Sequence, residues 1–194
     1  MPTRSLTADD KTAAGVGPID RATPGAAGVL RYRLNVVAST TEDVVRSAGG
    51  WLYDSARAGW DVNVLVADGG HPRPLTILGA SALDLEGDLL SMVRTASRGE
   101  ALAVSADLLG SDARVRDEVV RVLKRGLTDV TMWGTRWPAE LGRQAESVQH
   151  RVSAAARAFK SHALVAADVS TDAVTSTERL FRIGTGSFRR LYSV

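Results

Sequence analysis

The chain has 194 residues, of which 44% are hydrophobic, and a formal net charge of +2. This composition predicts one globular domain with a buried core and excludes a largely disordered chain. Because the chain contains no cysteine, disulfides, thiolate metal sites and cysteine nucleophiles are excluded. The small net charge gives no reason to expect a nucleic-acid partner. No apolar run is long enough to cross a bilayer and no signal-peptide core is present, so we expect no membrane contact and a cytoplasmic location.

The two ends of the chain differ in composition from its middle. Residues 1–28 are rich in Thr, Ala, Gly, Pro and Asp without apolar periodicity, which predicts a flexible N-terminal tail. We expect a single α/β domain over residues 29–183 and a basic C-terminal segment over 184–194. The segment combines glycines with Arg189 and Arg190, so an Arg-based nucleic-acid-binding protein is one alternative function.

Residues 33–68 predict a strand, a helix and a second strand. An apolar run over 34–38 predicts a buried strand, the helical stretch after it ends at Gly59, and 61–67 predicts the next strand. Such a unit within one sheet normally has parallel strands. Gly49 and Gly50 inside the predicted helix cost about 1 kcal/mol each relative to alanine. This cost predicts that a neighbouring element approaches the helix closely at the pair.

Turn residues separate the later elements. The predicted strands are a short one over 75–78, a buried one over 101–108 and another over 128–133. The predicted helices cover 87–97, 112–125 and, as a short last helix, 170–183. Ser111 is the expected N-cap of the helix 112–125, and Gly126 is expected to end it in a left-handed conformation. Consecutive strand–helix–strand units predict an α/β fold of three layers, with a mostly parallel open sheet of about five strands and flanking helices.

The segment 138–165 predicts a long C-terminal helix that begins at Pro138. Its apolar residues recur every three or four positions, at Leu141, Ala145, Val148, Val152, Ala155 and Phe159. This seam fits a helix packed on the sheet. The same spacing also fits helix pairing, so a homodimer formed through the helix 138–165 is a second hypothesis.

The sequence ARAGWDVNVLVAD, residues 56–68, resembles the second strand of dinucleotide-binding Rossmann domains, where a glycine that ends a helix precedes the strand. The resemblance implies that Asp68 matches the acidic residue that holds the adenosine ribose in that family. Rossmann domains place G-x-G-x-x-G between the first strand and helix, whereas this chain has Ser39-Thr40-Thr41-Glu42-Asp43 there. The acidic pair in this stretch repels a phosphate. We therefore expect a Rossmann-like topology without the Gly-rich fingerprint and with no cofactor.

Side chains beyond the carboxyl ends of parallel strands form the default binding crevice of such a sheet. Asp68 and His71 are close enough in the sequence to form a carboxylate–imidazole pair, which can serve as a general base. Large aromatic residues on both sides of Arg136 can anchor a ligand or a partner. No metal-ligand spacing is present. The candidate ligand-binding residues are Ser39, Thr40, Asp68, His71, Asp107, Trp133, Arg136 and Trp137.

The sequence contains no recognisable catalytic set, which predicts a non-enzymatic α/β protein that binds a small molecule or a protein at the carboxyl edge of its sheet. The alternative is an enzyme that acts on a nucleotide or sugar-phosphate through Asp68, His71 and Asp107. The alternative requires these three side chains to converge in one pocket.

Overall fold

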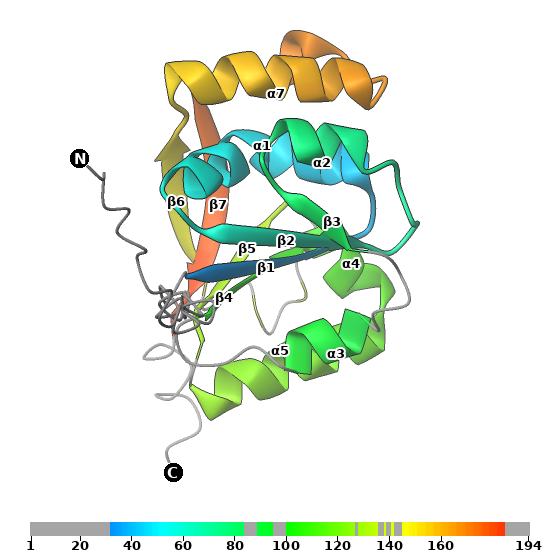
Figure 1. The fold of residues 1–194 in the computed structure, drawn as a ribbon. Helices are drawn as coiled ribbons and strands as arrows, with labels where there is room; N and C mark the ends of the chain where they lie inside the picture. The colour runs from blue at the N-terminus through cyan, green and yellow to red at the C-terminus, as the bar shows by residue number, and fades with distance from the viewer. Residues whose placement is uncertain are drawn as a thin grey trace, which may run out of the picture. The chain divides into compact units, whose positions relative to one another are not determined.

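The structure is a computed structural model that describes residues 32–83, 89–94, 100–126, 128–135, 138, 141 and 145–184. Within these residues a single seven-stranded sheet has the order β3-β2-β1-β4-β5-β7-β6, with helices flanking it (Figure 1). The predicted tail 1–28 and residues 185–194 of the predicted basic segment lie outside the described residues. No helix in the described part of the chain is both long and apolar enough to span a membrane.

Five strands of the sheet are parallel: β1 (Arg33–Ala38), β2 (Asp61–Val66), β3 (Ser81–Leu83), β4 (Glu100–Ser105) and β5 (Val130–Trp133). The chain runs outward from β1 through β2 to β3 and then returns to β4 on the other side of β1. The strand order therefore reverses between β1 and β4, and the C-terminal ends of all five strands meet at one edge, here called the carboxyl edge. These five parallel strands are the part of the sheet that agrees with the prediction of a mostly parallel sheet of about five strands.

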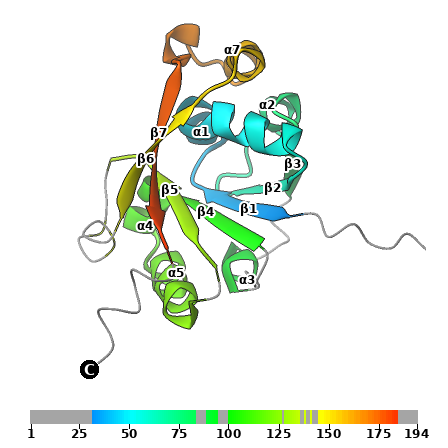
Figure 2. The same ribbon diagram turned by 90° about the vertical axis from the view of Figure 1, so that its left-hand side faces the viewer.

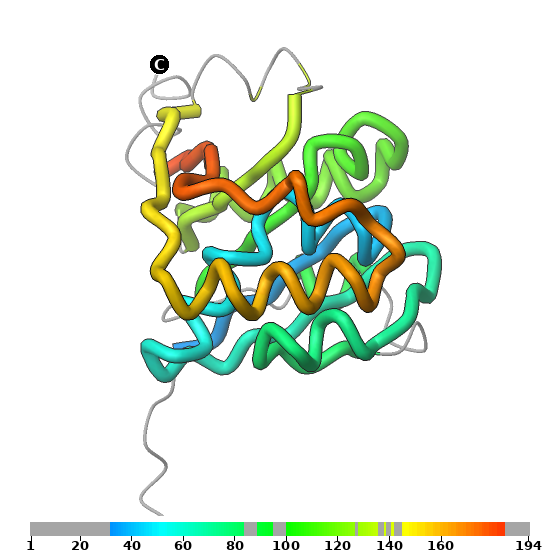
Figure 3. The backbone as a smooth tube through the Cα atoms, turned by 90° about the horizontal axis from the view of Figure 1, so that it is seen from above, coloured from blue at the N-terminus to red at the C-terminus, as the bar shows by residue number. Residues whose placement is uncertain are grey.

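Helices cover both faces of the parallel strands (Figure 1). One face carries α1 (Thr41–Arg57) and α2 (Arg73–Ile77), and α7 (Ala154–Ala166) packs on these two helices, as the view from above also shows (Figure 3). The opposite face carries α3 (Leu89–Arg94), α4 (Ala106–Ser111) and α5 (Ala113–Arg125). Each face buries its own apolar cluster, because strands covered on both sides need aliphatic residues on both.

The ends of α5 test two sequence predictions. Gly126 ends the helix with φ of +63°, which confirms the predicted left-handed cap. The N-cap is Asp112 rather than Ser111, since the Asp112 carboxylate accepts from the backbone amides of Arg114 (2.8 Å) and Val115 (3.3 Å). Ser111 belongs to α4 and donates to the Leu108 carbonyl (3.3 Å). The helix α4 begins where the sequence predicts the end of a strand. Because α4 includes Ser111, the N-cap of α5 lies one residue later than predicted.

The predicted strand over 75–78 is wrong, because this segment belongs to α2 and its C-terminal turn. The prolines at 72 and 74 lie at the start of the helix, where a missing amide hydrogen costs nothing and the fixed φ of proline suits the helix. The third strand follows instead as β3, after Gly79 with φ of +76°.

The predicted long helix 138–165 is also wrong: its middle forms β6 (Glu146–Arg151), and the helix α7 begins only after Ser153, whose hydroxyl accepts from the Ala156 amide (3.0 Å). The predicted short helix 170–183 consists instead of the 3-10 turn η1 (Thr171–Ala173) and the strand β7 (Thr177–Ile183). Figure 2 shows β6 and β7 extending the sheet toward α7, and the two strands pair antiparallel. The sheet is therefore mixed, with seven strands instead of about five.

The apolar residues that predicted the long helix leave the middle of the segment almost unspecified. Only Val148 of that seam lies in β6, whose residues are mostly exposed. Pairing with β7 specifies the strand, and it brings His150 opposite Glu178 and Glu146 opposite Arg182. The seam proposed for a homodimer is consequently divided between a strand and a helix.

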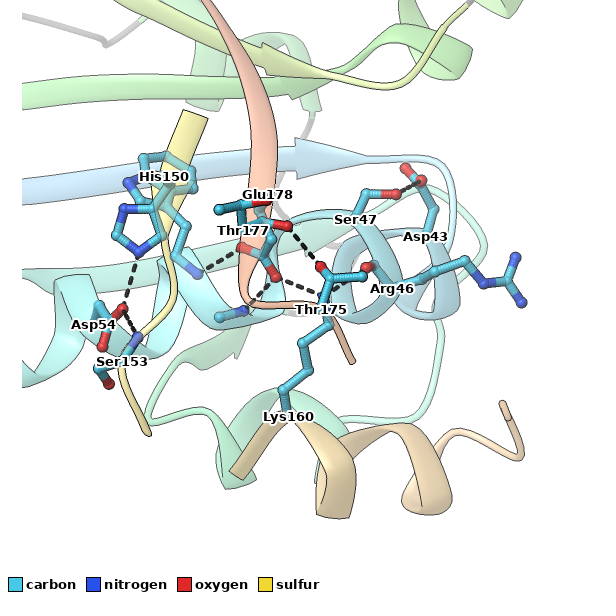
Figure 4. A network of polar contacts seen from close by, with 12 residues as sticks. Asp43, Arg46, Ser47, Asp54, His150, Ser153, Lys160, Thr175, Thr177 and Glu178 are labelled. Atoms are coloured by element: carbon cyan, nitrogen blue, oxygen red, sulfur yellow. Dashed lines mark hydrogen bonds and ion pairs between the residues drawn. The ribbon is translucent and has the colours of Figure 1, made fainter. Parts of the chain in front are cut away.

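A buried ion pair holds α1 against the C-terminal elements. Lys160 Nζ of α7 lies 2.6 Å from Glu178 Oε1 of β7, and both side chains are at most 2% exposed. The Glu178 carboxylate accepts from the backbone amides of Gly50 (2.8 Å) and Trp51 (2.7 Å), while Lys160 donates to the Arg46 carbonyl (2.7 Å) (Figure 4). A Cβ on Gly50 would lie 2.6 Å from Val152 Cγ1, which confirms the close approach predicted at the glycine pair.

Candidate functional site

The carboxyl edge is built from the loops that follow β1, β2, β4 and β5. The first of these loops ends at Thr40, which has extended backbone angles and caps α1 because its hydroxyl accepts from the Asp43 amide (3.0 Å). This cap directs the first turn of α1 to the point where the strand order reverses. The loop after β4 brings Asp107 to the same point, in the first turn of α4.

Asp43 is the carboxylate that joins these loops. Its Oδ2 accepts from Trp133 Nε1 at the end of β5 (2.8 Å), and its Oδ1 accepts from the Ser47 hydroxyl one turn along α1 (3.0 Å). Figure 4 shows the contact with Ser47. Trp133 is fully buried, whereas Asp43 is half-buried. Asp43 therefore presents a fixed, half-buried carboxylate at the carboxyl edge.

The surroundings of Asp43 raise its pKa above that of an ordinary aspartate. Burial is the largest cause, and the negative charge of Asp107 acts in the same direction. The hydrogen bonds from Trp133 and Ser47 and the charge of Arg46 lower the pKa without overcoming these effects. A carboxylate with a raised pKa is a stronger base than a free aspartate, which suits proton transfer near neutral pH.

The sequence-predicted residues of the loops after β1 and β2 have mostly local partners. Thr40 serves as the helix cap. Asp68 accepts from the Gly70 amide (3.0 Å), and His71 Nδ1 accepts from the Arg73 amide (3.2 Å). Asp68 and His71 thus each bind a backbone amide of their own loop, and the geometry supports a loop-stabilising role for both. Ser39 lies at the end of β1, half-buried.

The predicted residues of the later loops have different positions. Asp107 is exposed beside Asp43 and acts on its pKa. Trp133 is in the core and presents only its ring nitrogen to the site, so it holds Asp43 in place instead of offering a surface for a ligand. Arg136 and Trp137 lie outside the described residues.

The sequence did not single out Asp43 as a candidate site residue, since the acidic pair was considered only as a repellent of phosphate. The available signal was the spacing Thr40-x-x-Asp43, which places the carboxylate in the first turn of a capped helix. Its partner Trp133 is 90 positions away, so the sequence could not reveal the contact.

Thr41 is a second residue that the sequence did not single out. It is 7% exposed, and its Oγ1 is buried with no hydrogen-bond partner in the described structure. A Cβ on Gly70 would collide with this oxygen, so the loop after β2 lies directly on the first turn of α1. The loop that contains Asp68 is thereby held against the start of α1.

Hydrolytic sites often hold a metal ion through three or more protein ligands. Among the described residues, no group of three or more His, Cys, Asp or Glu side chains could hold one.

Comparison with known proteins identifies a fold. No family model matches the chain, and no curated protein matches it significantly. A deacetylase–teicoplanin complex from the teicoplanin biosynthesis pathway is 13% identical, with a TM-score of 0.52, and the match covers 78% of this chain and 98% of that one. A deacetylase of the A40926 pseudoaglycone is 16% identical, with a TM-score of 0.48 over 70% of this chain and 81% of that one.

The comparison with the deacetylase–teicoplanin complex establishes that this chain shares its fold. Because the protein of similar fold is an enzyme, this finding contradicts the prediction of a non-enzymatic binding protein. It favours the alternative prediction, an enzyme.

Proposed function

We propose that this chain is a hydrolase that removes an N-acyl group from an amino sugar, with Asp43 as the general base. The observation that carries the proposal is the position of Asp43: a half-exposed carboxylate with a raised pKa, where the strand order reverses. The fold shared with a deacetylase supports the reaction class.

The charge of the carboxyl edge supports an amino sugar over a phosphorylated substrate. Asp43, Asp68 and Asp107 follow three different strands and face this edge with negative charge. A phosphate would be repelled by these groups, whereas a free amine product becomes a cation that they attract. This argument departs from the nucleotide or sugar-phosphate substrate of the sequence-based alternative.

In the proposed reaction, Asp43 accepts a proton from a water molecule whose oxygen attacks the acyl carbon. The C–N bond then breaks, and the proton passes from Asp43 to the departing nitrogen, which yields a carboxylic acid and an amine. Trp133 and Ser47 keep the carboxylate oriented toward the substrate through their hydrogen bonds. Asp107 raises the basicity of Asp43 through its charge.

The test is release of acetate from N-acetylglucosamine, with its 1-phosphate as the competing substrate, followed by NMR of the acetate methyl group. Asp43→Asn should lower kcat/KM by about 10² to 10⁴, the usual contribution of a general base. Asp172→Asn is the matched control, because Asp172 is an exposed carboxylate of η1 that contacts Ser170. The control should leave the rate unchanged.

The pH dependence gives a second readout. The rate should rise as Asp43 loses its proton, with a midpoint above the pKa of an ordinary aspartate. Asp107→Asn removes a like charge, so it should move the midpoint to lower pH. An Asp43→Asn variant with full activity, or a wild-type protein that releases no acetate from either sugar, would overturn the proposal.

A further inference from the structure

A cavity of about 790 Å³ lies at the end of the sheet opposite the carboxyl edge. It is bounded by the start of β1 and β4, the last turns of α1, and residues of β6 and β7, and we call it the amino-edge cavity. Its lining includes Tyr32, Trp51, Asp54, Trp60, His150 and Arg182. The volume falls in the usual range of small-molecule sites. Asp54 is roughly 16 Å along α1 from Asp43, at 1.5 Å of helix rise per residue, so the cavity is separate from the proposed catalytic site.

One part of the cavity lining is aromatic. The rings of Tyr32 and Trp60 have centroids 5.2 Å apart and planes tilted by 31°. Trp51 and Trp60 are half-buried, and Tyr32 is 62% exposed, so the three rings leave apolar surface open to a ligand. Aromatic faces supply a large and rigid contact area for a flat apolar ligand surface.

The other part of the lining is a fixed polar pair. His150 Nε2 of β6 lies 2.9 Å from Asp54 Oδ2 of α1, and the same oxygen accepts from the Ser153 amide (3.2 Å) (Figure 4). Burial alone would raise the pKa of Asp54, but the hydrogen bonds from Ser153 and His150 lower it overall. Asp54 is therefore ionised at neutral pH and can only accept, so His150 Nε2 carries the hydrogen of this contact.

The charges around the cavity are mixed. Asp54, Glu100 and Asp129 are negative and Arg182 is positive, while Glu100 already binds Arg33 (2.7 Å). Hydroxyl groups of Ser55 and Thr131 add donors and acceptors without charge. A strongly anionic or cationic ligand would meet a like charge on one side of this lining, whereas a neutral ligand with several hydroxyls would find partners on every side.

We propose that the amino-edge cavity is a binding site for a neutral carbohydrate. The apolar C–H face of a pyranose ring packs on the aromatic rings of Trp51 and Trp60. Its neighbouring hydroxyls bind Asp54 Oδ1 and the guanidinium of Arg182, which can engage two adjacent polar atoms, while Asp54 Oδ2 keeps its contacts with His150 and Ser153. The site is independent of the proposed deacetylation, because none of its residues contacts Asp43.

The test uses the full chain, titrated with cellobiose by calorimetry and by ligand-observed NMR. We expect saturable binding with a Kd in the millimolar range or tighter. Trp60→Ala should weaken binding at least tenfold, and Trp60→Phe, which keeps a ring, should retain most of the affinity. Asp43→Asn should bind cellobiose as the wild type does, and this result separates the cavity from the catalytic site.

Three results would overturn the carbohydrate assignment. The first is no saturable binding of cellobiose. The second is that Asp43→Asn loses cellobiose binding while folded Trp60→Phe and Trp60→Ala keep it, which would place the sugar at the carboxyl edge. The third is tighter binding of benzyltrimethylammonium or benzoate than of cellobiose. Circular dichroism of each variant verifies that the fold is intact.

Discussion

Asp43 and Asp54 are at opposite ends of α1, and their pKa values are shifted in opposite directions. Burial is the largest single influence on both carboxylates, and by itself it would raise the pKa of each. At Asp43, the donors Trp133 and Ser47 do not overcome burial, and the charge of Asp107 adds to its effect. At Asp54, the donors Ser153 and His150 do overcome it.

This difference shows that donors and nearby charges, and not burial alone, decide what a carboxylate can do. With a like charge beside it, Asp43 is suited to accept a proton. Asp54 remains ionised and is suited to accept hydrogen bonds. The Lys160–Glu178 pair contacts α1 between the two carboxylates, so the same clamp supports both ends of the helix.

Breaking this clamp should have the largest effect on stability. Lys160→Met leaves the Glu178 carboxylate buried without its cation, which should lower the free energy of unfolding by about 3–5 kcal/mol. Urea denaturation measures the loss. The double variant Lys160→Met/Glu178→Gln removes both charges and should recover part of it. A loss below about 1 kcal/mol in the single variant would show that the pair does not support α1.

The glycine pair offers a matched comparison of intermediate size. Gly50→Ala would place a Cβ 2.6 Å from Val152 Cγ1 and 3.0 Å from Glu178 Oε1, so it should destabilise the protein by about 1–3 kcal/mol. The Cβ in Gly49→Ala would meet the flexible Leu78 Cδ1 at 3.3 Å. The gain in helix propensity, about 1 kcal/mol, should offset that contact. Thermal unfolding of both variants measures the difference, and equal losses would contradict the packing argument.

The two carboxylates should also contribute to stability with opposite pH dependence. The folded-state pKa of Asp54 is lowered, so its contribution is present above the unfolded pKa and disappears as the pH falls through the folded pKa. The folded-state pKa of Asp43 is raised, so its contribution is present below the unfolded pKa and disappears as the pH rises through the folded pKa.

Asp54→Asn and Asp43→Asn therefore provide the smallest but most direct test of the comparison. Asp54→Asn should cost about 1–2 kcal/mol near neutral pH, the contribution of a hydrogen-bonded charge, and less in acid. For Asp43→Asn, the cost relative to the wild type should instead decrease as the pH rises. Denaturation of the three proteins between about pH 3 and pH 7 measures both slopes. Slopes of the same sign would contradict the comparison.

The prediction from sequence succeeded where neighbouring residues suffice to specify structure. The apolar run of β1 and the left-handed Gly126 are local features, and such features led to the parallel strands and several helices of the fold. The carboxyl edge followed from that topology, because parallel strands end on the same side. Asp68, Asp107 and Trp133 consequently lie at the carboxyl edge, and their part in ligand binding stays a prediction.

Sequence alone determined the unit β1–α1–β2, the parallel part of the sheet and the close approach at Gly50, since apolar runs, helix caps and glycines act within a few residues. Tertiary structure alone decided that residues 146–151 form a strand, because only Val148 of the apolar seam lies there and the pairing with β7 is a contact distant in sequence. The tertiary structure also decided the surroundings of Asp43 and of Asp54, the carboxylates of the two proposed sites. Asp43 meets Trp133 across 90 positions and Asp54 meets His150 across 96, and only the folded sheet brings these residues together.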